Sequence, residues 1–92
     1  MKIAIIGTGN LGGSIAKGLI TNNAITTLYL TRRNVKDLAD FEGYQNVYLT
    51  SDNKEAIQKS DIIILAVQPA HLEIILTEIQ PFLTEKHVLI ST

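Results

Sequence analysis

The stretch that decides the fold is "IAIIGTGNLGGSIAKGL", residues 3–19. Its first four residues are apolar and mostly β-branched, a pattern typical of a strand buried on both faces of a parallel sheet. Four glycines follow at Gly7, Gly9, Gly12 and Gly13. The apolar residues beyond the turn recur at helical spacing, at Leu11, Ile15, Ala16 and Leu19. A buried strand, a glycine turn and an amphipathic helix therefore open the chain.

The rest of the chain alternates between the same two patterns. Further strands are predicted at residues 27–31, 47–49, 61–67 and 88–91, with helical segments between them. The order β-α-β-α-β-α-β-α-β predicts an α/β fold with an open parallel sheet of the Rossmann type. Right-handed crossovers give the expected strand order 3-2-1-4-5. Residues 1–92 are interpreted as one domain.

Polar residues and prolines mark the expected ends of the helices. Thr21-Asn22-Asn23 breaks the first helix, and Asn34 provides an N-cap for the second. Asp52 and Glu55 have the spacing of a capping box on a short third helix. Pro81 ends the fourth helix.

Composition excludes several classes of function. The chain has 92 residues, no cysteine and a formal net charge of −1. Disulfides, zinc-thiolate sites and thiol catalysis are therefore excluded, and a reducing cytoplasmic location is expected. No apolar run approaches the roughly 18 residues of a membrane span, and no signal peptide is recognisable. The near-neutral charge favours neither nucleic acid nor a membrane as a partner.

The glycine turn has the pattern G-x-G-x-x-G, from Gly7 to Gly12. It follows a predicted strand and opens a predicted helix, the context in which this motif indicates dinucleotide binding. Gly7 permits the tight turn, Gly9 lets a pyrophosphate approach the backbone, and Gly12 allows close helix packing. Free N–H groups at the helix start would hold the phosphate charge. The alternative is a turn whose glycines serve packing alone.

The end of the second predicted strand distinguishes between two dinucleotides. NAD-binding domains carry an acidic residue about 20 residues beyond the glycines, where it accepts hydrogen bonds from the ribose. This chain has Thr31-Arg32-Arg33-Asn34 there. A guanidinium can bind a 2′-phosphate, so the sequence favours NADP over NAD as the cofactor. Arg32 could also stack on the adenine; alternatively, both arginines are solvated surface charges.

The nicotinamide end is expected over the ends of the fourth and fifth strands, at 66–69 and at Ser91-Thr92. The alternative at 66–69 is an ordinary strand end, with Pro69 starting a helix. His71 is either a substrate contact or a surface histidine. The sequence offers no convincing catalytic residue and no cluster of metal ligands.

Three segments, "MKIAIIGTGNLGGSIAKGL", "TSDNKEAIQKSDIIILAVQP" and "HVLIST", together resemble the N-terminal domain of pyrroline-5-carboxylate reductases. The resemblance extends over essentially the whole chain. It implies a cofactor site in which residues from Ile6 to Leu11 cradle the pyrophosphate, Arg32 and Arg33 meet the 2′-phosphate, and Asn53 bonds the adenosine portion. The expected cofactor-binding residues are Ile6, Gly7, Thr8, Gly9, Asn10, Leu11, Gly12, Thr31, Arg32, Arg33, Asn53, Ala66, Val67, Gln68 and Pro69.

The family reduces 1-pyrroline-5-carboxylate to L-proline by hydride transfer from NADPH or NADH. Its helical C-terminal domain forms the dimer and supplies most of the substrate pocket, and this domain is absent here. The resemblance therefore implies a homo-oligomeric parent enzyme and a fragment that is inactive alone. Gln68 stands where the family usually has lysine.

Two other functions remain open from the sequence. One is the NADP-binding half of a deazaflavin-dependent NADP reductase or of a prephenate dehydrogenase-like enzyme. The other is a nucleotide-sensing module without catalysis.

Overall fold

The sheet is built around β1 (Lys2–Ile6), which contains the apolar run that opens the chain. The computed structural model describes residues 1–21 and 27–91. The elements that follow β1 are α1 (Asn10–Ile20), β2 (Thr27–Thr31), η1 (Val35–Phe41), β3 (Val47–Thr50), α2 (Asn53–Gln58), β4 (Ile62–Leu65), α3 (Pro69–Ile79), η2 (Gln80–Phe82) and β5 (Val88–Ser91). The two η elements are 3₁₀ helices.

In the described part of the chain, five parallel strands form one sheet in the order β3-β2-β1-β4-β5. The predicted Rossmann-type fold and strand order are therefore confirmed. The central strand β1 pairs with β2 on one side, Ile3 opposite Leu28, and with β4 on the other, Ile3 opposite Ile62. Because the chain leaves β1 in one direction and returns to its other side, a crevice opens at the carboxyl ends of β1 and β4.

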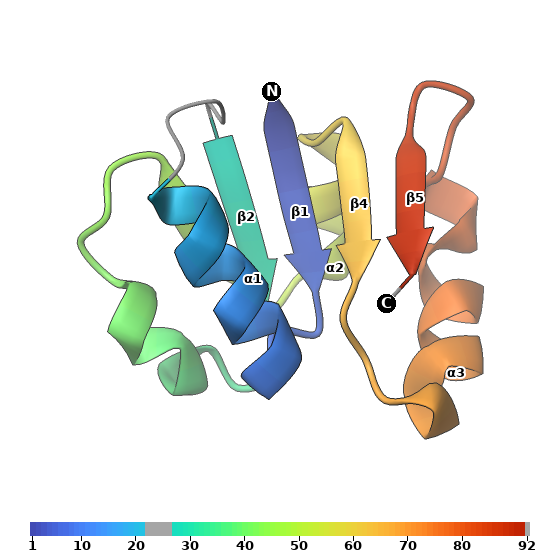
Figure 1. Ribbon diagram of the computed structural model, residues 1–92. Helices are drawn as coiled ribbons and strands as arrows, with labels where there is room; N and C mark the ends of the chain where they lie inside the picture. Colours follow the sequence, from blue (N-terminus) through green and yellow to red (C-terminus); the bar gives the residue numbers. More distant parts are fainter. Residues whose placement is uncertain (22–26, 92) are drawn as a thin grey trace.

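Two helical layers cover the two faces of the sheet (Figure 1). On one face, Ile3 and Ile5 pack in a cluster that includes residues of α1 and η1. On the other face, Ala4 and Ile6 pack in a cluster that includes residues of α2 and α3. These four residues of β1 are 4% exposed or less, so the prediction of a strand buried on both faces is confirmed. No helix in residues 1–21 or 27–91 has the length and apolar character needed to cross a membrane.

Several helix and strand boundaries differ from the expected ones. The element after Asn34 is a 3₁₀ helix with a kink at Leu38, where φ is −100° and ψ is 15°. β4 ends at Leu65, two residues before the predicted end, because the chain must turn to begin α3 at Pro69. Asn22 and Asn23, expected in the first helix break, and Thr92, expected beside Ser91 at the cofactor, lie outside the described residues.

Leu11 also departs from the helical pattern of its neighbours. The spacing predicts a core-facing position, yet its side chain is 54% exposed. α1 begins directly after the glycine turn, so its first turn lies beyond the carboxyl end of β1, where no strand lies beneath it (Figure 1). The Leu11 side chain is therefore exposed beyond the edge of the sheet.

The start of α2 is fixed by the predicted cap. The Asp52 side chain accepts hydrogen bonds from the backbone N–H of Lys54 at 3.0 Å and of Glu55 at 3.4 Å. Glu55 does not complete the capping box, because the Asp52 N–H donates to Thr50 Oγ1 at 3.0 Å and the Glu55 carboxylate pairs with Lys59 at 3.9 Å. The cap therefore determines where α2 begins, and with it the position of its first residue, Asn53.

Replacing the cap should destabilise the protein without touching its core. We expect Asp52→Ala to lower the free energy of unfolding by about 1 kcal/mol, because two backbone donors lose their acceptor. Asp52→Asn should retain most of the stability. The measurement is urea unfolding followed by circular dichroism.

The matched control is Asp40→Ala, which removes an exposed carboxylate that has no hydrogen bond or ion pair with any described residue. If Asp52→Ala is no less stable than Asp40→Ala, the cap does not stabilise α2.

Candidate functional site

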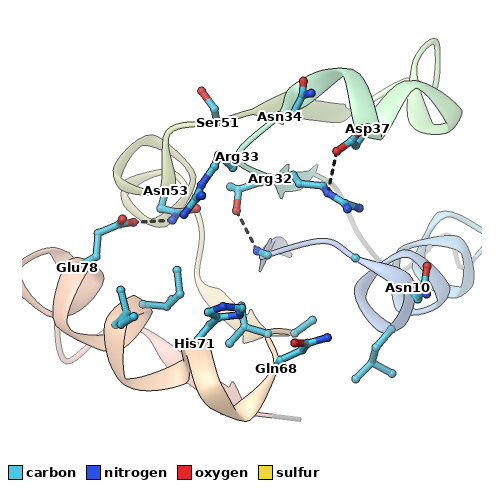
Figure 2. A pocket seen from close by; sticks show the side chains of 18 of the residues that line it. Asn10, Arg32, Arg33, Asn34, Asp37, Ser51, Asn53, Gln68, His71 and Glu78 are labelled. Atoms are coloured by element: carbon cyan, nitrogen blue, oxygen red, sulfur yellow. Dashed lines mark hydrogen bonds and ion pairs between the residues drawn. The ribbon is translucent and has the colours of Figure 1, made fainter.

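A pocket of about 990 Å³ lies at the carboxyl ends of the strands (Figure 2). Its walls come from the turn after β1, the segments after β2, β3 and β4, and one side of α3. The lining residues are Gly7, Gly9, Asn10, Leu11, Thr31, Arg32, Arg33, Asn34, Asp37, Ser51, Asn53, Ala66, Val67, Gln68, Pro69, His71, Ile74, Ile75 and Glu78. The pocket thus brings together most of the residues that the sequence predicts for a cofactor site.

The three glycines of the motif lack a side chain for two different reasons. At Gly7 the backbone has φ of +76°, and a Cβ atom would lie 2.3 Å from Val67 Cγ1. At Gly12 a Cβ would lie 3.1 Å from Ala66 Cβ and 3.2 Å from a methyl group of Ile5. The protein's own packing therefore explains both glycines. At Gly9 a Cβ would meet nothing within 4 Å, so open space at the pocket wall is what this glycine preserves.

The first turn of α1 presents free hydrogen-bond donors beside that open space. Gly9 is the N-cap residue and has no side chain to accept from the helix, and the first turn carries no acidic residue. Gly13 N–H donates to the Gly9 carbonyl at 2.7 Å. No described residue accepts from the N–H groups of Asn10, Leu11 and Gly12. Donors of this kind, at the positive end of a helix dipole, suit an anion such as a pyrophosphate.

Hydrogen bonds to β2 hold the turn in place. Gly7 N–H donates to Thr31 Oγ1 at 3.2 Å, and Thr8 N–H donates to the Thr31 carbonyl at 2.8 Å. Thr8 Oγ1 donates back to the Ile5 carbonyl at 3.2 Å. Both threonines are 1% exposed. Three of the expected cofactor-binding residues do not line the pocket: Ile6, Thr8 and Gly12. They support the pocket wall from behind.

The two adjacent arginines differ in their contacts. Arg32 donates through Nη1 to the Thr8 carbonyl at 3.1 Å, and its Nε lies 3.4 Å from Asp37 Oδ2. Arg33 has no hydrogen bond or ion pair with any residue that the structure describes. Their side chains point in different directions, Arg32 to Asp37 and Arg33 toward Asn53 (Figure 2). The charge of Arg32 is therefore balanced within the protein, whereas that of Arg33 is available to a ligand.

Asn34 supports this arrangement from the start of η1. Its Oδ1 accepts from Lys36 N–H at 3.1 Å, which confirms the predicted cap. The Asn34 carbonyl accepts from Asp37 N–H at 3.0 Å. The cap thus places the Asp37 carboxylate within reach of Arg32.

The opposite wall is formed by residues 66–68, which follow β4, and by α3. Gln68 is the N-cap of α3 without a side-chain cap bond, and Pro69 is in its first turn, which confirms that Pro69 starts a helix. His71 is exposed on the pocket wall. Asn53 donates through Nδ2 to Glu78 Oε2, joining α2 to α3 across the pocket (Figure 2). Ser91, at the end of β5, is not part of the lining.

Six lining residues were not expected from the sequence: Asn34, Asp37, Ser51, Ile74, Ile75 and Glu78. A periodic signal existed for those on α3, because His71, Ile74 and Glu78 recur every three or four residues on one face. Ser51 directly follows β3, at the same edge of the sheet as the other strand ends. Among the described residues, no group of three or more histidine and carboxylate side chains could hold a metal ion.

Comparisons with known proteins agree with this geometry. A family model described as "NADP oxidoreductase coenzyme F420-dependent" matches residues 2–92. The Dictyostelium discoideum protein named pyrroline-5-carboxylate reductase 2 is 42% identical over 95 residues, which cover 98% of this chain and 31% of that protein. The chain therefore spans about a third of the length of this curated relative.

Solved structures give the same result. A pyrroline-5-carboxylate reductase from Coxiella burnetii matches with a TM-score of 0.87 and 32% identity, over 98% of this chain and 34% of that one. A Plasmodium falciparum pyrroline carboxylate reductase, solved with NADP bound, matches with a TM-score of 0.79 and 27% identity, over 99% of this chain and 32% of that one. The predicted resemblance to pyrroline-5-carboxylate reductases is therefore confirmed.

The glycines should respond differently to the same substitution. We expect Gly7→Ala to lower the free energy of unfolding by about 2–4 kcal/mol. The alanine backbone would be held in the left-handed region, and its Cβ would overlap Val67. Gly9→Ala should cost less than about 1 kcal/mol, since its Cβ enters open space. Denaturant unfolding of the two variants beside the wild type makes the comparison. Equal losses of stability in the two variants would contradict the interpretation that Gly7 is required for packing and Gly9 only for open space.

Proposed function

Because the chain belongs to the family described as NADP oxidoreductase coenzyme F420-dependent, we propose that residues 1–92 form a domain that binds NADP(H). The single observation that carries this proposal is the first turn of α1, whose free N–H groups adjoin the open space at Gly9. We further propose that the intact gene product is an NADPH-dependent oxidoreductase that reduces 1-pyrroline-5-carboxylate to L-proline.

In the proposed complex the pyrophosphate lies over the glycine turn. The N–H groups of Asn10 and Leu11 donate to its oxygens, and the helix dipole adds a favourable field. A side chain at position 9 would occupy the space that the phosphates need. Thr31 and Thr8 act indirectly, because their hydrogen bonds hold the turn to β2.

The 2′-phosphate is assigned to Arg33 in this proposal. Arg33 lines the pocket and has an unbalanced charge among the described residues, and its fork of N–H donors suits a phosphate. Arg32 is held against the Thr8 carbonyl and Asp37, so it offers a fixed planar surface beside the turn. The support for NADP over NAD is therefore carried by Arg33 more than by Arg32.

The nicotinamide is assigned to the segment Ala66, Val67, Gln68 and Pro69. These residues line the pocket and follow β4, which lies on the other side of β1 from β2, the strand that the arginines follow. When bound, NADPH supplies the hydride, which goes to the cyclic imine carbon while a proton completes the amine. The residues of this segment orient the ring and exclude water from one side of it. The proton donor and most contacts to the substrate are assigned to parts of the protein beyond this chain.

The names of relatives support this substrate, since two of them are pyrroline-5-carboxylate reductases of Dictyostelium discoideum, 42% and 37% identical to the chain. From the family resemblance we propose a homo-oligomeric enzyme, and from the absence of cysteine a reducing, cytoplasmic location.

The two arginines should separate in cofactor titrations. We expect Arg33→Ala to weaken NADPH binding by about tenfold or more while changing NADH binding by less than about twofold, because it removes charged hydrogen bonds to the 2′-phosphate alone. Arg32→Ala should weaken both dinucleotides alike. The measurement is nicotinamide fluorescence at low and moderate salt.

The control for these titrations is Lys36→Ala, which removes an exposed cation outside the lining. Equal NADPH and NADH affinities in the wild type would contradict the assignment of Arg33. Binding of neither dinucleotide would contradict the proposed function itself.

The reaction is tested with the intact gene product. We expect loss of NADPH absorbance on addition of 1-pyrroline-5-carboxylate, with L-proline as the product. Arg33→Ala should raise the KM for NADPH and leave kcat near the wild-type value, since its contact is made equally in the ground and transition states. Hydride exchange with coenzyme F420, without reduction of the imine, would replace this function with that of an F420-dependent NADP reductase.

A further inference from the structure

A bridge between α2 and α3 crosses one end of the pocket. Asn53, the first residue of α2, donates through Nδ2 to Glu78 Oε2 near the end of α3 (Figure 2). Both residues line the pocket, and 25 positions separate them in the chain. The hydrogen bond is charge-assisted, a class that is stronger than a bond between neutral groups. Glu78 therefore acts on a residue expected to contact the cofactor.

The chemistry of the two groups determines the orientation of the amide. An ionised carboxylate can only accept hydrogen bonds, so Asn53 must present its NH₂ group to Glu78. The carbonyl Oδ1 lies on the other side of the same planar group and is turned away from Glu78. An asparagine with no such neighbour could present either atom to the pocket. Glu78 thus selects one of two orientations.

The surroundings indicate what Oδ1 would meet. Asn53 is half-buried, and the Asp52 cap fixes the backbone that carries it. Arg33 points toward Asn53 from the other side (Figure 2). This end of the pocket is the one to which the 2′-phosphate is assigned, so a ribose lies next to it. A ribose hydroxyl is a donor that the fixed Oδ1 can satisfy.

We propose that Glu78 is a positioning residue for the adenosine half of the dinucleotide: its carboxylate holds the Asn53 carboxamide so that Oδ1 accepts from a ribose hydroxyl. The inference rests on the proposed function, because it needs a dinucleotide in the pocket. It assigns to Glu78 an indirect effect, exerted through Asn53 alone. A direct electrostatic effect predicts the opposite sign, since removing a carboxylate would then strengthen the binding of a phosphorylated ligand.

The test is a double-mutant cycle with NADPH and NADH titrations of the 92-residue chain. We expect Glu78→Ala to weaken both dinucleotides by about three- to tenfold, the effect of one misplaced hydrogen bond. Glu78→Gln should stay within about twofold of the wild type, because its side-chain carbonyl can still accept from Asn53 Nδ2. Asn53→Ala should weaken binding by a similar factor, and adding Glu78→Ala to it should have no further effect.

Glu73→Ala is the matched control, because it removes a carboxylate from the same helix outside the lining. Thermal unfolding of every variant identifies any general loss of structure. A second readout needs no nucleotide: the Asn53 side-chain NH₂ signals in an NMR spectrum should shift in Glu78→Ala and not in Glu73→Ala.

Four outcomes would overturn the proposal. They are wild-type affinity in Glu78→Ala, tighter NADPH binding in Glu78→Ala, an equal loss when Glu78→Ala is made in the Asn53→Ala background, and unshifted Asn53 signals. If the wild type binds neither dinucleotide, the proposed function fails and the ribose contact fails with it. The NMR shift then still reports whether Glu78 orients Asn53, so the two failures are distinguishable.

Discussion

The rest of the structure depends on the absence of a side chain at Gly7. The chain leaves β1 there with φ of +76°, and a Cβ atom would lie 2.3 Å from Val67 Cγ1. The same residue donates to Thr31 Oγ1 on β2. One turn therefore brings together the ends of β1 and β2 and the segment after β4. It also sets the direction of α1, whose free N–H groups face the pocket, because no residue intervenes between the turn and the helix cap at Gly9 except Thr8.

The fold and much of the pocket could be predicted because their signals are local. Apolar runs such as Ile3–Ile6 identify buried strands, and the handedness of crossovers then leaves few strand orders. Pocket residues next to the glycine turn or to strand ends were found because parallel strands end at one edge. Asp37 and Glu78 were missed because helical spacing does not identify the partner of an acidic residue. The partners, Arg32 and Asn53, approach these carboxylates only in the folded chain. Leu11 shows the converse, since helical periodicity does not tell where the sheet beneath a helix ends.

Charge in the pocket is arranged in pairs that leave a local excess. Asp37 balances Arg32, and Glu78 engages a neutral amide rather than a cation. Among the residues that line the pocket, Arg33 and the start of α1 are left as the positive features. The chain as a whole has a net charge of −1, so attraction of an anion does not come from a general field. In the proposed complex it comes from Arg33 and the start of α1, whose positive charge no carboxylate of the pocket balances. This arrangement suits the ligand that we propose, an extended dinucleotide whose phosphates lie at separate places.

The position of β1 at the centre of the sheet also has a consequence for how the protein is made. β1 precedes the other described strands in the chain, yet its partner β4 begins at Ile62, which pairs with Ile3. Contacts this distant in sequence slow folding, because a long loop must close before any of them stabilises the chain. During translation β1 has an unpaired edge until Leu65 has left the ribosome. Val67, which closes over Gly7, arrives later still. The two sides of the pocket therefore come together late in synthesis, and a nascent chain exposes a hydrophobic strand edge before it can hold any ligand.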